Sequence, residues 1–159
     1  VDYVTGKGMM NGTADNTFSP KANTTRGMVV TVLYRLENQP STSAASFTDV
    51  ASGAYYANAV AWANANGIVS GYGSGKFGPN DKVTREQLAA ILYRYMGSPT
   101  ATGSLTGFTD RANVSTYATT AMQWAIGKGY ITGIGTKLDP KGNATRAQVA
   151  VIIHRFLTK

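Results

Sequence analysis

The stretch Phe77-Gly78-Pro79-Asn80-Asp81-Lys82-Val83-Thr84-Arg85-Glu86-Gln87 decides the fold, because its pattern occurs three times in the chain. In each copy a Phe-x-Pro or Leu-x-Pro turn leads to a Thr-Arg step, and apolar residues at helical spacing follow the arginine. The copies place their arginines 59 and 61 residues apart, at Arg26, Arg85 and Arg146. Self-similarity at a fixed period predicts three copies of one helical unit.

Other positions repeat together with the arginines. A Gly-x-x-x-Gly loop precedes each turn, and a Phe-x-Asp segment stands further upstream at 47–49 and 108–110. The first copy is truncated, because it lacks the Phe-x-Asp segment and most of the first helix. We expect the repeats to occupy residues 1–40, 41–99 and 100–159 and to form one globular unit, in line with the chain length.

Apolar spacing predicts two helices in each complete repeat. Over 55–66 and again over 117–128, an aromatic residue and small residues recur on one face, and a glycine suits the end of each helix. The helix after each arginine has a clearer apolar stripe, formed by Val29, Val32, Leu33 and Leu36 in the first copy. We therefore predict an all-α fold, with Trp62 and Trp124 in the core and linkers over 38–46 and 97–107.

Composition limits the classes of partner. The 159 residues include no cysteine and carry a formal net charge of +7, which favours an anionic partner. The basic residues are scattered, so we expect no nucleic-acid partner. No apolar run is long enough to span a membrane, so we expect no membrane insertion.

The Thr-Arg step combines two kinds of residue. Thr84 with Gln87 fits a capping box, as does the third copy, so these side chains need no functional role. A cation in the first turn of a helix is mildly unfavourable, so the repeated arginine needs a reason. Either the arginine and the helix start bind an anion together, or each arginine pairs with an aspartate such as Asp49 or Asp110. Residue chemistry alone leaves both alternatives open.

The remaining candidate residues favour a non-catalytic protein. A single histidine, His154, and the absence of cysteine allow neither a nucleophilic triad nor a histidine-based metal site, and we expect no cofactor. The acids at Asp49, Glu86 and Asp110 have no defined separation that would indicate a glycosidase pair. A further repeated set, nine residues after the first arginines, is assigned a structural role by default: Arg35, Arg94 and Arg155.

The truncated first copy suggests a surface for self-association. With most of one helix missing, we expect the stripe of Val29, Val32 and Leu33 to be exposed unless another chain or the third repeat covers it. A protein-interaction or self-assembly module of a bacterial surface protein is therefore the alternative to ligand binding.

The set of motifs in fixed order resembles the S-layer homology (SLH) domains of bacterial surface proteins. The resemblance rests on residues 47–50, 67–71, 77–79 and 84–87 and covers nearly the whole chain. It implies a pseudo-threefold bundle with grooves between adjacent repeats. It also implies an extracellular module that anchors proteins to an anionic secondary cell-wall polysaccharide, often one bearing pyruvate ketals, in Gram-positive and some other bacteria.

The resemblance also implies a set of ligand-binding residues. In a glycan groove the arginines would hold a carboxylate, the acids would accept sugar hydroxyls, the tyrosines would stack on a sugar and the loop glycines would allow close backbone approach. The residues at these positions are Arg26, Arg85, Arg146, Asp49, Asp110, Tyr55, Tyr117, Gly71 and Gly133. The family often has Glu where Met28, Gln87 and Gln148 stand, and often has Trp where the two tyrosines stand. We therefore expect the groove of the second and third repeats to be best formed, and Arg26 to have lost neighbours that Arg85 and Arg146 keep.

Overall fold

Six α-helices carry the fold in the computed structural model, which describes residues 1–44 and 47–158. Each repeat contributes a shorter first helix and a longer second helix, and no strand forms in the described residues beyond isolated β-bridges. The all-α prediction is confirmed. In chain order, the elements are α1 (Asp2–Gly6), α2 (Arg26–Leu36), α3 (Ala57–Ala65), α4 (Arg85–Tyr95), η1 (Arg111–Asn113), η2 (Thr116–Ala118), α5 (Thr119–Gly127) and α6 (Arg146–Thr158).

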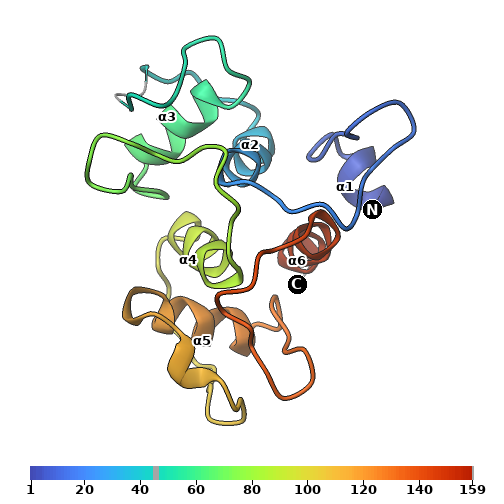
Figure 1. Cartoon of the computed structure of the whole chain (residues 1–159), viewed down its shortest axis with the longest axis vertical. Coiled ribbons are helices and arrows are strands. Elements are labelled where there is room, and N and C mark those ends of the chain that lie inside the picture. The colour runs from blue at the N-terminus through green and yellow to red at the C-terminus, as the bar shows by residue number, and fades with distance from the viewer. Residues whose placement is uncertain (45–46, 159) are drawn as a thin grey trace.

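The second helices form the centre of a pseudo-threefold body. Figure 1 shows α2, α4 and α6 around a common axis, with α3, α5 and α1 outside them. The closest helix pairs are α2 with α3, α4 with α5, and α6 with α1. The second helix of each repeat therefore packs on the first helix of the following repeat, and the third repeat closes the circle on the first.

Helix starts follow the predicted capping pattern. Thr84 accepts a hydrogen bond from the Gln87 N–H, and Gln87 Oε1 accepts one from the Thr84 N–H at 3.0 Å. The same pair of bonds joins Thr145 and Gln148. In α2 only the threonine half exists, because Met28 cannot return the bond.

A closed ring of backbone hydrogen bonds surrounds the pseudo-threefold axis. The Thr24 N–H donates to the Ala144 carbonyl, the Ala144 N–H to the Val83 carbonyl, and the Val83 N–H to the Thr24 carbonyl, each at 2.9 Å. All three residues are fully buried and stand two positions before the helix arginines. Because each residue comes from a different repeat, the ring fixes the three repeats in one register.

Two aspartates hold the turns of the second and third repeats. Asp49 accepts the N–H groups of Phe77 and Gly78, and Asp110 accepts those of Leu138 and Asp139, all at 2.8 Å. Hydrogen bonds from the turn, that of Phe77 above all, lower the pKa of Asp49. Burial alone would raise the pKa of Asp110, but the bonds from its turn outweigh burial and lower it. Both side chains therefore act as charged acceptors that shape the Phe-x-Pro or Leu-x-Pro turn.

The core contains the apolar stripe of every second helix and both tryptophans. Trp62 and Trp124 are buried, as predicted. The expectation that Val29, Val32 and Leu33 are exposed is wrong, because α3 of the second repeat covers α2. The short first helix instead leaves part of α6 uncovered, where Val151 is 46% exposed. The second helix that is left partly uncovered therefore belongs to the third repeat and not to the first.

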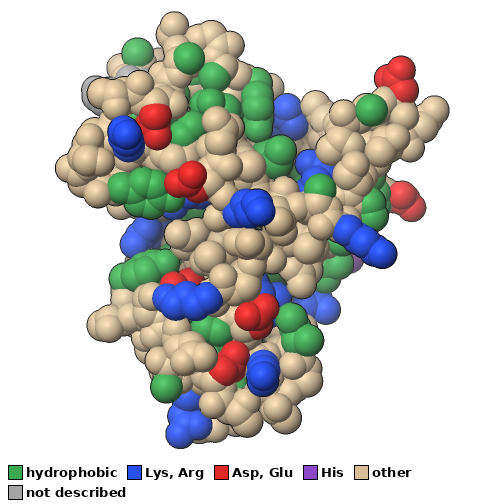
Figure 2. All heavy atoms as spheres, viewed as in Figure 1, with side chains coloured by type: hydrophobic (Ala, Val, Ile, Leu, Met, Phe, Trp, Pro, Cys, Tyr) green, Lys and Arg blue, Asp and Glu red, His purple; other side chains and the backbone are tan. Residues whose placement is uncertain are grey.

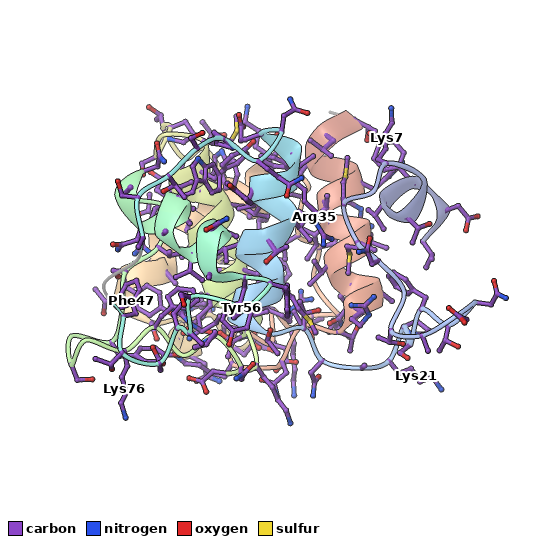
Figure 3. All side chains as sticks on the ribbon, turned by 90° about the horizontal axis from the view of Figure 1, so that it is seen from above. Lys7, Lys21, Arg35, Phe47, Tyr56 and Lys76 are labelled. Atoms are coloured by element: carbon purple, nitrogen blue, oxygen red, sulfur yellow. The ribbon has the colours of Figure 1, made fainter. Side chains whose placement is uncertain are left out.

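The segments between repeats are irregular. Residues 38–44 and 97–107 contain no helix, as the linker prediction states, while residues 45–46 of the first linker lie outside the described part of the chain. Leu105 of the second linker is buried in the core. In the side view of Figure 3, Lys21 and Lys76 mark loops at one end of the body, away from Lys7.

The buried hydroxyl of Thr24 predicts a stabilising substitution. Thr24 Oγ1 has no hydrogen-bond partner, and the equivalent position in the second repeat is Val83. We expect Thr24→Val to raise the free energy of unfolding by about 1 kcal/mol, because it removes an unsatisfied polar group at nearly constant volume. Urea unfolding measures the change. Thr31→Val is the matched control, since the Thr31 hydroxyl donates to the Gly27 carbonyl at 2.7 Å, and equal effects of the two substitutions would contradict the prediction.

The turn-holding role of Asp110 predicts an acid-sensitive stability. A carboxylate whose pKa is lowered in the folded state stabilises that state above its unfolded pKa, near 4, and the contribution disappears as pH falls through the folded pKa. Asp110→Asn should cost about 1 kcal/mol near neutral pH, because the amide offers one acceptor oxygen to two N–H groups. Thermal unfolding from pH 7 to pH 2 should show a smaller loss below pH 4 in the variant, and parallel curves would refute this account.

Candidate functional site

Each helix arginine docks into the next repeat around the circle. Arg26 Nε donates to the Phe77 carbonyl at 3.0 Å and Nη2 to the Ser70 carbonyl at 3.2 Å. The other two repeat this arrangement between repeats two and three and between repeats three and one: Arg85 with Leu138 and Thr132, and Arg146 with Phe18 and Asn11. All three side chains are 4–7% exposed. The arginines thus bond to backbone carbonyls of the neighbouring repeat.

The backbone N–H groups at the start of each second helix also bond to carbonyls of the neighbouring repeat. The Arg85 N–H donates to the Gly142 carbonyl and the Glu86 N–H to the Pro140 carbonyl, and the other two repeats show equivalent bonds. The next free donor is taken by the capping threonine. The alternative in which helix N–H groups join the arginine in holding an anion therefore does not apply, because those groups are already bonded.

Neither of the two alternatives for the arginine describes its contacts. The guanidinium pairs with carbonyls instead of Asp49 or Asp110, although Asp49 and Arg26 hold opposite sides of the same turn. Nε and Nη2 are used, and Nη1 has no hydrogen bond within residues 1–44 and 47–158. Each arginine is therefore a structural link between two repeats, and its side chain also lines a groove.

Three grooves lie at equivalent places between the repeats, and each is named here after the second-helix arginine that lines it. Each is also lined by the docked arginine of the preceding repeat and by the Gly-x-x-x-Gly loop of its own repeat. The volumes are about 350, 260 and 440 Å³. Small-ligand sites measure about 300–1,000 Å³, so the first and third grooves lie near the lower end of that range and the second lies just below it. They are the Arg94 groove (with Arg26 and loop 69–72), the Arg155 groove (with Arg85 and loop 131–134) and the Arg35 groove (with Arg146 and loop 9–13).

Sequence reasoning missed the second arginine of each groove. Arg35 Nη1 donates to the Met9 carbonyl at 3.2 Å, and Arg155 Nη1 donates to Thr132 Oγ1 at 3.4 Å, whereas the Arg94 side chain has no hydrogen bond in the described part of the chain. Figure 3 shows Arg35 on α2, in the middle of the body. The exact nine-residue spacing from the first arginines could have indicated a paired role.

The tyrosines distinguish the three grooves. Tyr117 lines the Arg94 groove and Tyr55 lines the Arg35 groove, each from the repeat that follows the groove's own repeat. Both rings are more than half exposed. The Arg155 groove has no tyrosine, because the following repeat there is the truncated first one. The expectation that Arg26 has lost its neighbours is therefore wrong, and the groove with a missing neighbour is that of Arg85.

The loop glycines line two grooves and also have a steric role. Gly71 lies in the Arg94 groove and Gly133 in the Arg155 groove. A Cβ at Gly71 would lie 2.6 Å from the Phe47 ring, and one at Gly133 would lie 2.5 Å from the Phe108 ring. Only glycine fits beneath these rings, which explains the second glycine of the loop motif.

Asp49 and Asp110 lie outside the three grooves. Neither is among the groove-lining residues, and both oxygens of each carboxylate accept backbone N–H groups of a turn. The structure therefore separates the predicted acids from the predicted arginines and tyrosines.

Charge in the grooves is positive and unpaired. The one side-chain ion pair in residues 1–44 and 47–158 joins Lys141 to Glu86, so none of the six groove arginines contacts a carboxylate there. Figure 2 shows acidic and basic side chains interspersed over the visible face, without a continuous basic patch. Two guanidinium groups converging on one groove can hold a carboxylate through charge-assisted hydrogen bonds.

Two other kinds of site are absent from the described residues. No cluster of three or more His, Asp or Glu side chains could hold a metal ion there. None of the helices in that part of the chain has the length and apolar character to cross a membrane.

Known proteins share this pattern of repeats. The sequence profile of the S-layer homology domain matches residues 1–27, 46–89 and 107–150. Similar proteins include an amylopullulanase of Thermoanaerobacterium thermosulfurigenes (33% identity), the exoglucanase XynX of Acetivibrio thermocellus (30%) and the surface-layer 125 kDa protein of Lysinibacillus sphaericus (28%).

The chain corresponds to a small part of each relative. The alignments cover 99–100% of this chain but only 9%, 15% and 14% of the three relatives. The enzyme names therefore describe much longer proteins, whereas the shared segment is the repeated module. The profile matches cover most of the chain in three blocks, and they coincide with the motifs that build the fold. The chain thus belongs to the S-layer homology domain family, whose members are cell-surface anchoring modules.

Proposed function

We propose that the chain is a non-catalytic anchoring module that binds an anionic cell-wall polysaccharide in its inter-repeat grooves. A carboxylate of the polymer, such as that of a pyruvate ketal, sits between the two arginines of a groove. The observation that carries the proposal is the convergence of two arginines from adjacent repeats on each groove without a carboxylate partner in the described residues. Unpaired, partly desolvated guanidinium groups favour an anionic ligand.

Within this proposal, the two arginines have different tasks. Arg26, Arg85 and Arg146 are held by carbonyls and offer a donor group in a fixed position. Arg94 has no such bonds and is free to close on the ligand. A pair of this kind fixes the carboxylate at low entropic cost, because one partner is already ordered.

The other lining residues suit a sugar. The exposed rings of Tyr117 and Tyr55 offer apolar faces with a polar tip, which suits stacking on a pyranose. Gln87 lines the Arg94 groove with its oxygen engaged at the helix cap, so its amide group is left to donate to a hydroxyl. Because Gly71 and Gly133 have no side chain, a sugar can approach the loop backbone closely at these positions.

Several grooves on one body favour binding to a polymer. A polysaccharide with regularly spaced acidic groups can occupy more than one groove, so that the second contact becomes intramolecular. The chain then remains attached to the wall even when each groove binds a single acidic sugar weakly.

Arg94→Gln tests the proposal with little disturbance of the fold. We expect its affinity for purified pyruvylated wall polymer to fall by about tenfold to a hundredfold, since a charge-assisted contact contributes about 1.5–3 kcal/mol. Its melting temperature should remain unchanged, because the Arg94 side chain has no hydrogen bond to the described residues. Retention on immobilised polymer and thermal unfolding provide the two measurements.

Lys7→Gln is the matched control, because it removes the same charge from a residue outside the grooves. The control should bind like the unchanged protein, and de-pyruvylated polymer should retain none of the proteins. Equal retention of Arg94→Gln and Lys7→Gln on native polymer would contradict the proposed site. Concentration-dependent association without polymer binding would favour a self-assembly role instead.

A further inference from the structure

We infer that Glu86 is a positioning residue that fixes Tyr117 at the edge of the Arg94 groove and makes this groove the tightest of the three. The inference rests on the proposed function, since it ranks the grooves for an anionic sugar. It concerns a residue that lies beneath the groove and does not touch the ligand itself.

The carboxylate of Glu86 joins two repeats. Glu86 is 3% exposed and accepts hydrogen bonds from the Ser115 N–H at 2.9 Å and the Ser115 hydroxyl at 2.8 Å. Lys141 Nζ pairs with Glu86 at 2.6 Å and also contacts Ser115 Oγ. The Tyr117 hydroxyl completes the cluster, 3.3 Å from Glu86 Oε1. One buried acid on α4 therefore holds both the segment before η2 and the tyrosine of the groove.

The charge of Glu86 decides the direction of the contact. Burial alone would raise the pKa of Glu86, but the hydrogen bonds from Lys141 and Ser115 outweigh it and lower the pKa. An ionised carboxylate can only accept, so the Tyr117 hydroxyl must donate to it. Burial and the neighbouring Glu86 charge raise the pKa of Tyr117 to about 12. The phenol is therefore neutral and oriented by a charge-assisted hydrogen bond.

The other two grooves have no equivalent anchor. The position of Glu86 is occupied by Gly27 in α2 and Ala147 in α6. A Cβ at Gly27 would lie 2.9 Å from the Pro79 carbonyl oxygen, so the first repeat has no room for a side chain there. The Tyr55 ring of the Arg35 groove packs edge-on against Tyr56 at a centroid distance of 5.0 Å, and no carboxylate in the described residues holds its hydroxyl. The Arg155 groove contains no tyrosine at all.

These differences rank the grooves. A ring that is already fixed loses less conformational entropy when a sugar stacks on it. The Arg94 groove has an anchored tyrosine, the Arg35 groove has a less firmly held one and the Arg155 groove has none. The order of affinity for one acidic sugar is therefore Arg94 groove, Arg35 groove, Arg155 groove.

The contact itself is tested without any ligand. Glu86→Ala is expected to fold, since α6 carries alanine at this position, and Glu86→Gln keeps an acceptor oxygen as a more conservative variant. Titration of ¹³Cζ-labelled tyrosines by NMR should show the pKa of Tyr117 falling below its value of about 12 in Glu86→Ala but staying raised, because burial, the largest cause of the shift, remains. Tyr55 is the internal control and should titrate as before. An unchanged Tyr117 titration in Glu86→Ala would overturn the positioning role.

The ranking is tested by calorimetry with a methyl glycoside that bears a 4,6-pyruvate ketal. We expect Glu86→Ala to weaken the tightest site about fivefold, the effect of one hydrogen bond, and Glu86→Gln to weaken it less. Tyr55→Phe should weaken only the second site, and Lys7→Gln, which lies outside the grooves, should leave every site unchanged. Unchanged binding by Glu86→Ala, or a larger loss in Tyr55→Phe, would overturn the ranking. Failure of the unchanged protein to bind either the glycoside or the polymer would refute the proposed function and the ranking with it, while the tyrosine titration would still decide the role of Glu86.

Discussion

The structure depends on one contact made three times, the insertion of a buried guanidinium into the carbonyls of the next repeat. The bonds of Arg26 and Arg85 join adjacent repeats, and those of Arg146 join the third repeat to the first, across 128 residues of chain to the Phe18 carbonyl. The helix start beside each arginine bonds to the same turn. Because the circle is closed, each repeat contacts a neighbour on both sides. The backbone ring at the axis and the packing of the second helices follow from that closure.

The grooves are a consequence of the same contact. An arginine that reaches into the next repeat lies beside that repeat's glycine loop and second helix, so its side chain lines the groove between them. The structural and the proposed binding roles thus belong to one side chain, and loss of binding in a variant of Arg26 would not distinguish them. The second arginine separates the two roles, because Arg94 lines a groove without supporting the fold.

The sequence was sufficient for features that depend on local spacing. The period of the Thr-Arg step predicted three repeats, and Thr84 with Gln87 predicted a capping box that the structure contains. It was insufficient for features that depend on which repeat contacts which. Nothing in the spacing shows that α3 packs on α2 of the preceding repeat, so the stripe of Val29 was wrongly expected to be exposed. For the same reason, we expected the incomplete groove at Arg26, whereas it lies at Arg85. We also did not include Arg94 in the predicted site.

The account is tested most directly by urea unfolding of Arg26→Gln beside Arg94→Gln, two substitutions that remove the same charge from one groove. The account predicts that Arg26→Gln loses about 2 kcal/mol or more of unfolding free energy, because two buried carbonyls lose a charged donor. Arg94→Gln should unfold like the unchanged protein. Equal stability of the two variants would contradict the claim that closure of the repeats depends on the docked arginine.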